Sequence, residues 1–216
     1  MSSQVRGGTR WKRFAVVMVP SVIATAAVGV GLAQGALAAS FSVSGQEFKV
    51  SADELVGHDF VQYGSVATEN GADPKVAGKA HAVAVSGFHD ATITNMCQSV
   101  VTPDLPFGLG SITLQLKAGT GKEKVYAEGL YLDVSQLDAD AEFKNIDIGV
   151  AAGSLPRTSK GTGIQPGTQA NPNGFSQRAE EAKLTNVRQQ AWATTAGTFK
   201  LPDLKLRLLK GVKECY

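Results

Sequence analysis

The 216-residue sequence lacks the short motifs by which several large enzyme classes are recognised. It has no P-loop, no glycine-rich dinucleotide fingerprint and no HExxH, which argues against the nucleotide-binding folds and zinc metalloproteases built on those motifs. The G-x-S-x-G elbow that presents the nucleophile of many serine esterases is also missing. No serine of the sequence therefore lies in the strand-turn-helix elbow of those esterases.

Histidine and tryptophan are scarce as well. Only His58, His81 and His89 are available as the base of a catalytic triad. Trp192 is the only tryptophan after residue 38, which argues against a carbohydrate platform of stacked aromatic rings. No cysteine or histidine spacing fits a zinc site. We expect no metal and no cofactor.

The first 38 residues predict a secretory signal peptide. Four basic residues between Arg6 and Arg13 precede an apolar run from Phe14 to Leu37, which ends in the small residues of a cleavage site. Because a bilayer-spanning helix needs about 20 residues, an uncleaved N-terminal anchor is the alternative. We expect residues 39–216 to be exported, and the protein to be secreted or held on the extracellular face of the cell envelope.

Removal of this segment changes the charge of the chain. Four of the 21 basic residues and none of the 19 acidic ones lie in residues 1–38, so the exported part has a net charge of −2. It contains no basic patch interleaved with aromatic residues, so we expect no nucleic-acid partner. About 178 residues remain, which is the size of one domain.

The two cysteines, Cys97 and Cys215, both lie in the exported part. An even number of cysteines in an oxidising compartment predicts one disulfide. This bond would join the C-terminal end of the chain to the middle of the domain.

Alternating apolar residues predict a mainly β domain. The alternation is clearest in four segments, which are SITLQLK (111–117), GLYLDV (129–134), NIDIGV (145–150) and LKLRLL (204–209). FSVSGQEFKV (41–50) and HAVAVSGF (81–88) are rich in the valine and phenylalanine that strands prefer. We expect a single antiparallel sandwich or a curved, barrel-like sheet with at most one or two helices.

Two further segments carry separate expectations. FSQRAEEAKLTNVRQQAWATT (175–195) has a serine cap, early glutamates and a following glycine, which predict a helix over its N-terminal half. Between Pro156 and Ser176 the sequence is rich in proline and glycine, which predicts a long flexible loop that contacts a substrate or partner, or is only a surface excursion.

A weak internal repeat places an asparagine after similar residues three times. ATITNMC, AEFKNID and AKLTNVR contain Asn95, Asn145 and Asn186. The spacings between them are unequal, so a β-solenoid with an asparagine ladder is only a minority interpretation.

The candidate catalytic residues are two serines and two histidines. In AVSGFHDATITNMCQSV (84–100), Ser86 and His89 are three residues apart, so an extended strand points them to opposite faces unless Gly87 turns the chain. Because triads are assembled in space, a distant partner remains open. We expect Ser86 or Ser154 as the nucleophile and His89 or His58 as the base.

The segment LDADAEF (137–143) offers carboxylates instead. As a strand, it would place Asp138, Asp140 and Glu142 on one face and Ala139, Ala141 and Phe143 on the other. The acidic face could bind calcium, supply a glycosidase pair, or be a solvated strand face.

Four segments together resemble a known family. They are SFSVSGQEFKVSADELVG, ATITNMCQSV, NIDIGVAAGS and AWATTAGTFKLPDL. Over roughly residues 40–216 the chain resembles a family of secreted streptomycete proteins, many of them labelled cholesterol esterase, that is otherwise of unknown function. The resemblance implies a carboxylic ester hydrolase acting on sterol esters outside the cell. It assigns no nucleophile.

Three functional hypotheses follow. The first is a sterol esterase with an apolar cleft lined by residues such as Phe88, Phe107 and Leu109. The second is a lipid- or wall-binding module with the same cleft and no nucleophile. The third is a structural envelope protein held by its N-terminal segment, with residues 156–176 contacting a partner. The expected partner is an apolar lipid or sterol ester, and the N-terminal segment provides any association with the membrane or envelope.

Overall fold

The computed structural model describes residues 42–43, 45–69, 79–105, 110–155, 162–168 and 170–216. Apart from one 3-10 turn, η1, their regular structure is all β. The elements are β1 (Ser42–Val43), β2 (Phe48–Glu69), β3 (Ala80–Thr94), β4 (Met96–Leu105), β5 (Gly110–Ala118), β6 (Val125–Lys144), β7 (Asp147–Ala151), η1 (Ala152–Ser154), β8 (Phe175–Thr195), β9 (Thr198–Lys200) and β10 (Lys205–Lys210). The expected mainly β class is confirmed, and SITLQLK, GLYLDV and all but the first residue of LKLRLL lie in strands. NIDIGV is only partly a strand, because Asn145 and Ile146 precede β7, and Ile146 and Val150 pack on different core clusters.

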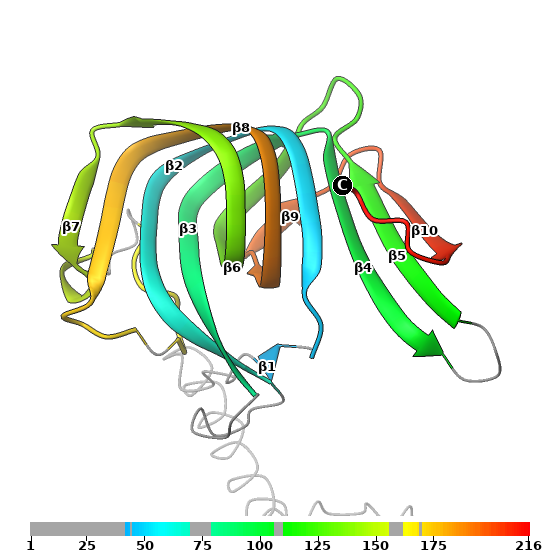
Figure 1. Ribbon diagram of the computed structural model, residues 1–216. Helices are drawn as coiled ribbons and strands as arrows, with labels where there is room; N and C mark the ends of the chain where they lie inside the picture. The colour runs from blue at the N-terminus through cyan, green and yellow to red at the C-terminus, as the bar shows by residue number, and fades with distance from the viewer. Residues whose placement is uncertain (1–41, 44, 70–78, 106–109, 156–161, 169) are drawn as a thin grey trace, which may run out of the picture. The chain divides into compact units, whose positions relative to one another are not determined.

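The strands form one sheet that closes on itself. Its order is β10-β5-β4-β2-β3-β6-β8-β7, and β2 also pairs with β8. The four long strands β2, β3, β6 and β8 therefore close into a small antiparallel barrel (Figure 1). Of the two expected architectures, a sandwich and a curved, barrel-like sheet, the fold is therefore the second.

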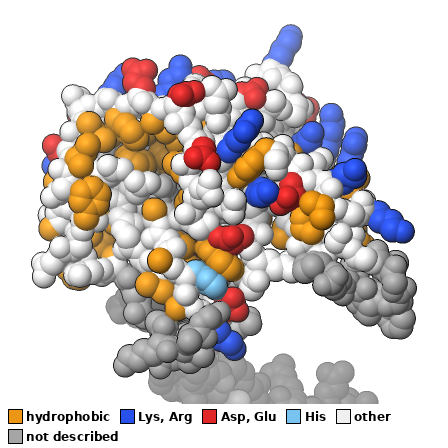
Figure 2. Space-filling view, viewed as in Figure 1, with side chains coloured by type: hydrophobic (Ala, Val, Ile, Leu, Met, Phe, Trp, Pro, Cys, Tyr) orange, Lys and Arg blue, Asp and Glu red, His pale blue; other side chains and the backbone are white. Residues whose placement is uncertain are grey.

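A second part of the sheet extends from the barrel. The strands β4, β5 and β10 continue from the N-terminal half of β2, and we call them the wing (Figure 1). Figure 2 shows lysine and arginine side chains gathered on the right of the view, over β5 and β10, and hydrophobic side chains on the left, over β8 and its neighbours.

The long strands bend at residues with left-handed backbone. A straight strand of the length of β2, 22 residues, would extend about 70 Å, far too long for a barrel of this size. Asp59, Asn95, Asn145 and Asn186 have φ between 51° and 55°. Asparagine and aspartate tolerate this conformation better than other residues with a Cβ. The repeated asparagines of the sequence therefore mark bends of a barrel, and the solenoid interpretation is wrong.

The apolar core has two parts on opposite faces of the sheet. Inside the barrel lie residues such as Leu55, Phe60, Phe88 and Leu130, and the Phe60 ring centroid is 5.3 Å from that of Phe88. On the outer face, Val61, Tyr63, Val83 and Val85 pack with Ala152 of η1, Leu155, Ile164 and Ala170. We call the described residues 162–168 and Ala170 the strap.

The predicted helix is wrong. Residues 175–195 form β8, which pairs with β2 on one side and with β6 on the other. Its β-branched residues suit a strand, and Ala182, Leu184, Val187 and Ala191 are buried inside the barrel between outward-facing charges. These two long pairings outweigh the local helix signals in its first half.

The predicted loop is only partly within the described residues, since 156–161 and 169 lie outside them. Thr162, Gly163 and Gln165 are buried, so this part packs on the barrel as the strap.

Every described strand pairing and both core clusters lie within Ser40–Tyr216, which forms one compact unit. None of the described residues belongs to a helix with the length and hydropathy needed to cross a bilayer.

Candidate functional site

Ser86 lies inside the barrel. Its side chain is buried, and its hydroxyl accepts a hydrogen bond from Gln62 Nε2 at 2.9 Å. Gln177 Nε2 in turn donates to Gln62 Oε1 at 2.6 Å. The three residues form a polar chain across β3, β2 and β8.

The histidines lie elsewhere. His58 is on the outside of β2, with 51% of its side chain exposed, and its Nδ1 is 2.8 Å from Asp90 Oδ1 and its Nε2 3.7 Å from Glu181 Oε2. His89 is exposed, and Ser154 at the end of η1 donates to the carbonyl of Ala151 at the end of β7. Ser86 and His58 therefore lie on opposite faces of the sheet.

No hydrogen bond joins a predicted nucleophile to a predicted base among the described residues. The adjacent His89 and Asp90 do not pair, because Asp90 reaches across to His58. The catalytic roles of Ser86, Ser154, His58 and His89 stay predictions.

The barrel interior contains an apolar cavity of about 140 Å³. Phe60, Phe88 and Phe143 contribute aromatic walls, and Gln62, Ser86 and Gln189 contribute polar groups. The other lining residues are Leu55, Leu132, Leu137, Ala139, Ala141 and Leu184. Because Leu137, Ala139 and Ala141 are exposed, this part of β6 forms the mouth of the cavity.

The cavity continues toward the wing. A smaller space of about 30 Å³ shares Leu55, Leu132 and Gln189 with it and reaches Met96 and Phe199. The interior is therefore a mainly apolar space with a few polar groups from β2, β3, β4 and β8.

A buried polar cluster lies under the strap. Tyr63 Oη accepts a hydrogen bond from the Gln165 amide at 2.8 Å, and Tyr131 Oη donates to the Gly163 carbonyl at 3.2 Å. Asp133 is only 7% exposed, and its burial raises the pKa of its carboxyl to about 6. Thr162 Oγ1 and Gln165 Oε1 have no partner among the described residues. The cluster contains an acid but no imidazole, so it offers no complete nucleophile and base.

An open polar groove of about 920 Å³ lies outside the barrel beside the C-terminal tail. Asp138 and Asp140 line the groove but not the cavity, and Ala141 and Phe143 line the cavity but not the groove. Leu137 and Ala139 lie at the boundary and line both. Asp140 accepts from Asn186 and Asp138 from Gln136. Among the described residues, no three His, Cys, Asp or Glu side chains gather as a metal site would require.

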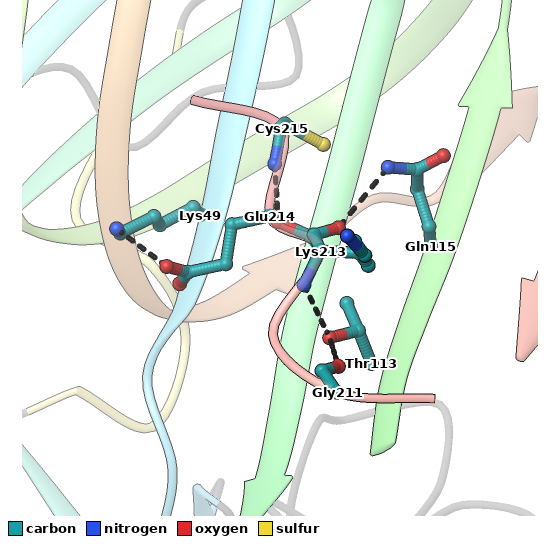
Figure 3. Close-up of polar contacts among 8 residues, drawn as sticks. Lys49, Thr113, Gln115, Gly211, Lys213, Glu214 and Cys215 are labelled. Atoms are coloured by element: carbon teal, nitrogen blue, oxygen red, sulfur yellow. Dashed lines mark hydrogen bonds and ion pairs between the residues drawn. The ribbon is translucent and has the colours of Figure 1, made fainter. Parts of the chain in front are cut away.

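The C-terminal tail closes one side of this groove. Cys215 forms the predicted disulfide with Cys97, and its amide donates to Ser99 Oγ at 3.0 Å. Figure 3 shows the tail across the wing, with Lys213 bonded to Thr113 and Gln115, and Glu214 paired to Lys49 at 2.9 Å. Burial is the main cause that raises the pKa of Tyr216, the last residue.

The sequence pointed to part of the cavity. Phe88 was expected to line an apolar cleft and does, whereas Phe107 and Leu109 lie outside the described residues. Phe60 and Phe143 were missed because no local pattern marks a residue that faces a barrel interior. Phe143 could have been found, since it shares the apolar face of LDADAEF with Ala139 and Ala141.

Comparison with known proteins adds the family. None of the curated proteins and none of the solved structures matches the chain. A family model described as "Family of unknown function (DUF6230)" matches residues 44–216, which is the whole barrel with its wing and tail. The chain belongs to this family of unknown function, DUF6230.

Proposed function

We propose that the exported domain binds a lipid through a single acyl chain, held in the barrel interior, and acts as a non-catalytic lipid-binding module of the cell envelope. The observation that carries the proposal is the apolar cavity with Phe60, Phe88 and Phe143 in its walls and Ser86 beside them. Ligand sites are typically apolar cavities with a few placed polar groups. The disulfide supports export, because disulfides persist in oxidising compartments.

The volume of the cavity favours an acyl chain over a sterol. It is about 140 Å³, roughly the share of four or five waters in the liquid and below the ~300 Å³ at which pockets for larger ligands begin. The end of a flexible chain fits this space, whereas a rigid four-ring sterol does not.

Ser86 supplies a polar contact for the ligand. Its hydroxyl accepts from Gln62, and its own proton has no acceptor among the described residues. A hydroxyl carries one donor and two acceptor positions. Ser86 is therefore free to donate to a carboxylate or ester carbonyl in the interior.

The test uses the chain from Ser40 to Tyr216, which contains every described pairing of the fold. Binding of cis-parinaric acid is followed by its fluorescence, with dodecanoate as competitor. Ala141→Phe places a ring in the exposed mouth, and we expect it to weaken binding at least tenfold. Glu142→Phe adds the same ring to the other face of β6 and should leave the affinity unchanged. Absence of saturable binding by the unmodified protein, or equal affinities of the two variants, would overturn the proposal.

Ester hydrolysis is the second candidate function. The resemblance to proteins labelled cholesterol esterase supports it, together with the His58–Asp90 contact of 2.8 Å. A carboxylate that orients an imidazole is the arrangement used by triad bases. The exported chain should be assayed with a short p-nitrophenyl ester and with cholesteryl oleate, alongside His58→Ala and His89→Ala. Hydrolysis that is lost in His58→Ala alone would establish the base, and no hydrolysis by folded protein would end this candidate.

A further inference from the structure

One face of the wing is made of leucine and other aliphatic side chains. Cross-strand pairing places Leu206 beside Leu116, Leu208 beside Leu114, and Leu114 beside Val100. Directly paired residues of antiparallel strands share a face. We call this surface the leucine face; its members are Val100, Ile112, Leu114, Leu116, Leu206 and Leu208.

The opposite face of the wing is covered by the protein itself. The residues that bind the C-terminal tail are Cys97, Ser99, Thr113 and Gln115, and all four belong to this other face. The disulfide holds the tail there, so the tail cannot also cover the leucines.

The leucine face is strongly exposed at its outer strand. Leu206 is 59% and Leu208 71% exposed, and Leu204 just before β10 is 50% exposed. At the inner strands Leu114 and Leu116 are half-buried. Isolated exposed leucines are common, but a contiguous set on one sheet face marks a binding surface.

The charge beside the leucine face selects the partner. Residues 110–118 and 204–213 contain Lys117, Lys205, Arg207, Lys210 and Lys213 and no acidic residue. Lys205 lies directly opposite Lys117 in the sheet, on the face away from the leucines. None of these five side chains forms an ion pair with another described residue. These neighbouring positive charges repel one another, and anionic groups of a partner would reduce that repulsion.

A second copy paired edge to edge through β10 does not meet this requirement. Two β10 edges paired antiparallel about their centre would set Lys205 opposite Lys210 of the other copy, twice. Like charges directly opposite one another destabilise a strand pair. In β10, Leu206, Leu208 and Lys210 share the leucine face, and Lys205 and Arg207 lie on the other face. Leucines flanked by lysine and arginine match a lipid interface, because the leucines enter the acyl region while the long cationic side chains reach the headgroups.

We propose that the leucine face and the basic residues of β10 dock the exported domain on an anionic lipid bilayer. The inner edge of this surface packs on the barrel core through Leu116, but docking does not require that the cavity hold a lipid. The docking places the outer strand of the wing at the membrane surface.

The test is co-sedimentation of the Ser40–Tyr216 chain with vesicles of phosphatidylcholine alone or with 30 mol% phosphatidylglycerol. We expect binding only to the anionic vesicles, and weaker binding in 0.5 M salt because salt screens exposed charges. Leu206→Gln/Leu208→Gln should reduce the bound fraction at least fivefold. Lys205→Gln/Arg207→Gln should also reduce it. The matched control is Ile148→Gln/Phe175→Gln, which removes two equally exposed apolar side chains from β7 and β8 and should bind as the unmodified protein does.

Three results would overturn the proposal. One is that no vesicle is bound, which would leave an acidic, apolar protein segment as the partner. Another is that the leucine variant binds as well as the control. The third is a dimer in sedimentation equilibrium that the leucine substitutions dissociate, which would assign the face to a second copy. Binding of cis-parinaric acid by the leucine variant, measured without vesicles, reports separately on the barrel cavity and on folding.

Discussion

Asn186 donates a hydrogen bond from its side-chain amide to Asp140 Oδ2, 2.8 Å away on the neighbouring strand. Asn186 lies within β8, yet its φ is 55°. Asn95 and Asn145 repeat the arrangement, with bonds to Asp53 and Glu180. At these three positions the asparagine adopts left-handed backbone and its side-chain amide donates to a carboxylate on another strand.

We predict that Asn186→Ala is less stable than Asn186→Gly. Both lose the bond to Asp140, but alanine also pays the strain of left-handed backbone, about 1–2 kcal/mol. Urea denaturation of both variants measures the difference. At the neighbouring Thr185, which lacks a positive φ, the order should reverse, since glycine weakens an extended strand. Equal stability of the two Asn186 variants would contradict the role of the bend.

These bends explain what the sequence could and could not predict. Alternation predicted strands such as β5, because the pattern lies within one short segment. The disulfide was predictable because the chain has only two cysteines, so only one pairing is possible. The helix predicted within 175–195 failed because capping residues are also local, whereas β8 is held by pairing with both β2 and β6.

The candidate site was harder to predict for the same reason. Ser86 and Phe88 are neighbours in one segment of the sequence. The cavity that both line also needs Phe60, Phe143 and Leu184, which come from three other strands. The alternation of Leu204, Leu206 and Leu208 predicts a buried face, yet all three are exposed. No sequence pattern distinguishes a face that meets the core from one that meets a partner.

The disulfide should contribute strongly to stability. Cys97–Cys215 closes a loop of 118 residues, for which chain entropy gives about 4–5 kcal/mol before any strain is subtracted. We expect Cys97→Ala/Cys215→Ala to lower the free energy of unfolding by roughly 2–4 kcal/mol, measured in guanidinium chloride. Dithiothreitol should lower the stability of the unmodified protein similarly and leave the double variant unchanged. A double variant as stable as the oxidised protein would contradict this.

Asp133 should make stability depend on pH. Burial raises its pKa from 3.8 to about 6, so the folded protein binds the proton more tightly than the unfolded chain does. Its contribution to stability is therefore greatest below pH 4 and falls as the pH rises to about 6, above which it is flat. Asp133→Asn should remove this dependence and stabilise the protein at pH 7 by roughly 1–3 kcal/mol. Asp138→Asn on the exposed part of β6 is the control. Thermal melts between pH 4 and 8 measure the stability of both variants. If both show the same pH dependence, Asp133 is not its source.

Gly57 and Gly64 make a matched pair on β2. A Cβ at Gly57 would overlap the Phe88 ring, whereas a Cβ at Gly64 meets nothing within 4 Å. Since overpacking a core typically costs about 1–3 kcal/mol, Gly57→Ala should destabilise the domain by that amount. It should also alter binding of cis-parinaric acid, because Phe88 lines the cavity. Gly64→Ala should leave the stability unchanged or raise it slightly by restricting the unfolded chain. Equal stability of Gly57→Ala and Gly64→Ala would contradict the close approach of β2 to Phe88. It would also remove the support that this approach gives to a narrow cavity, which favours an acyl chain over a sterol.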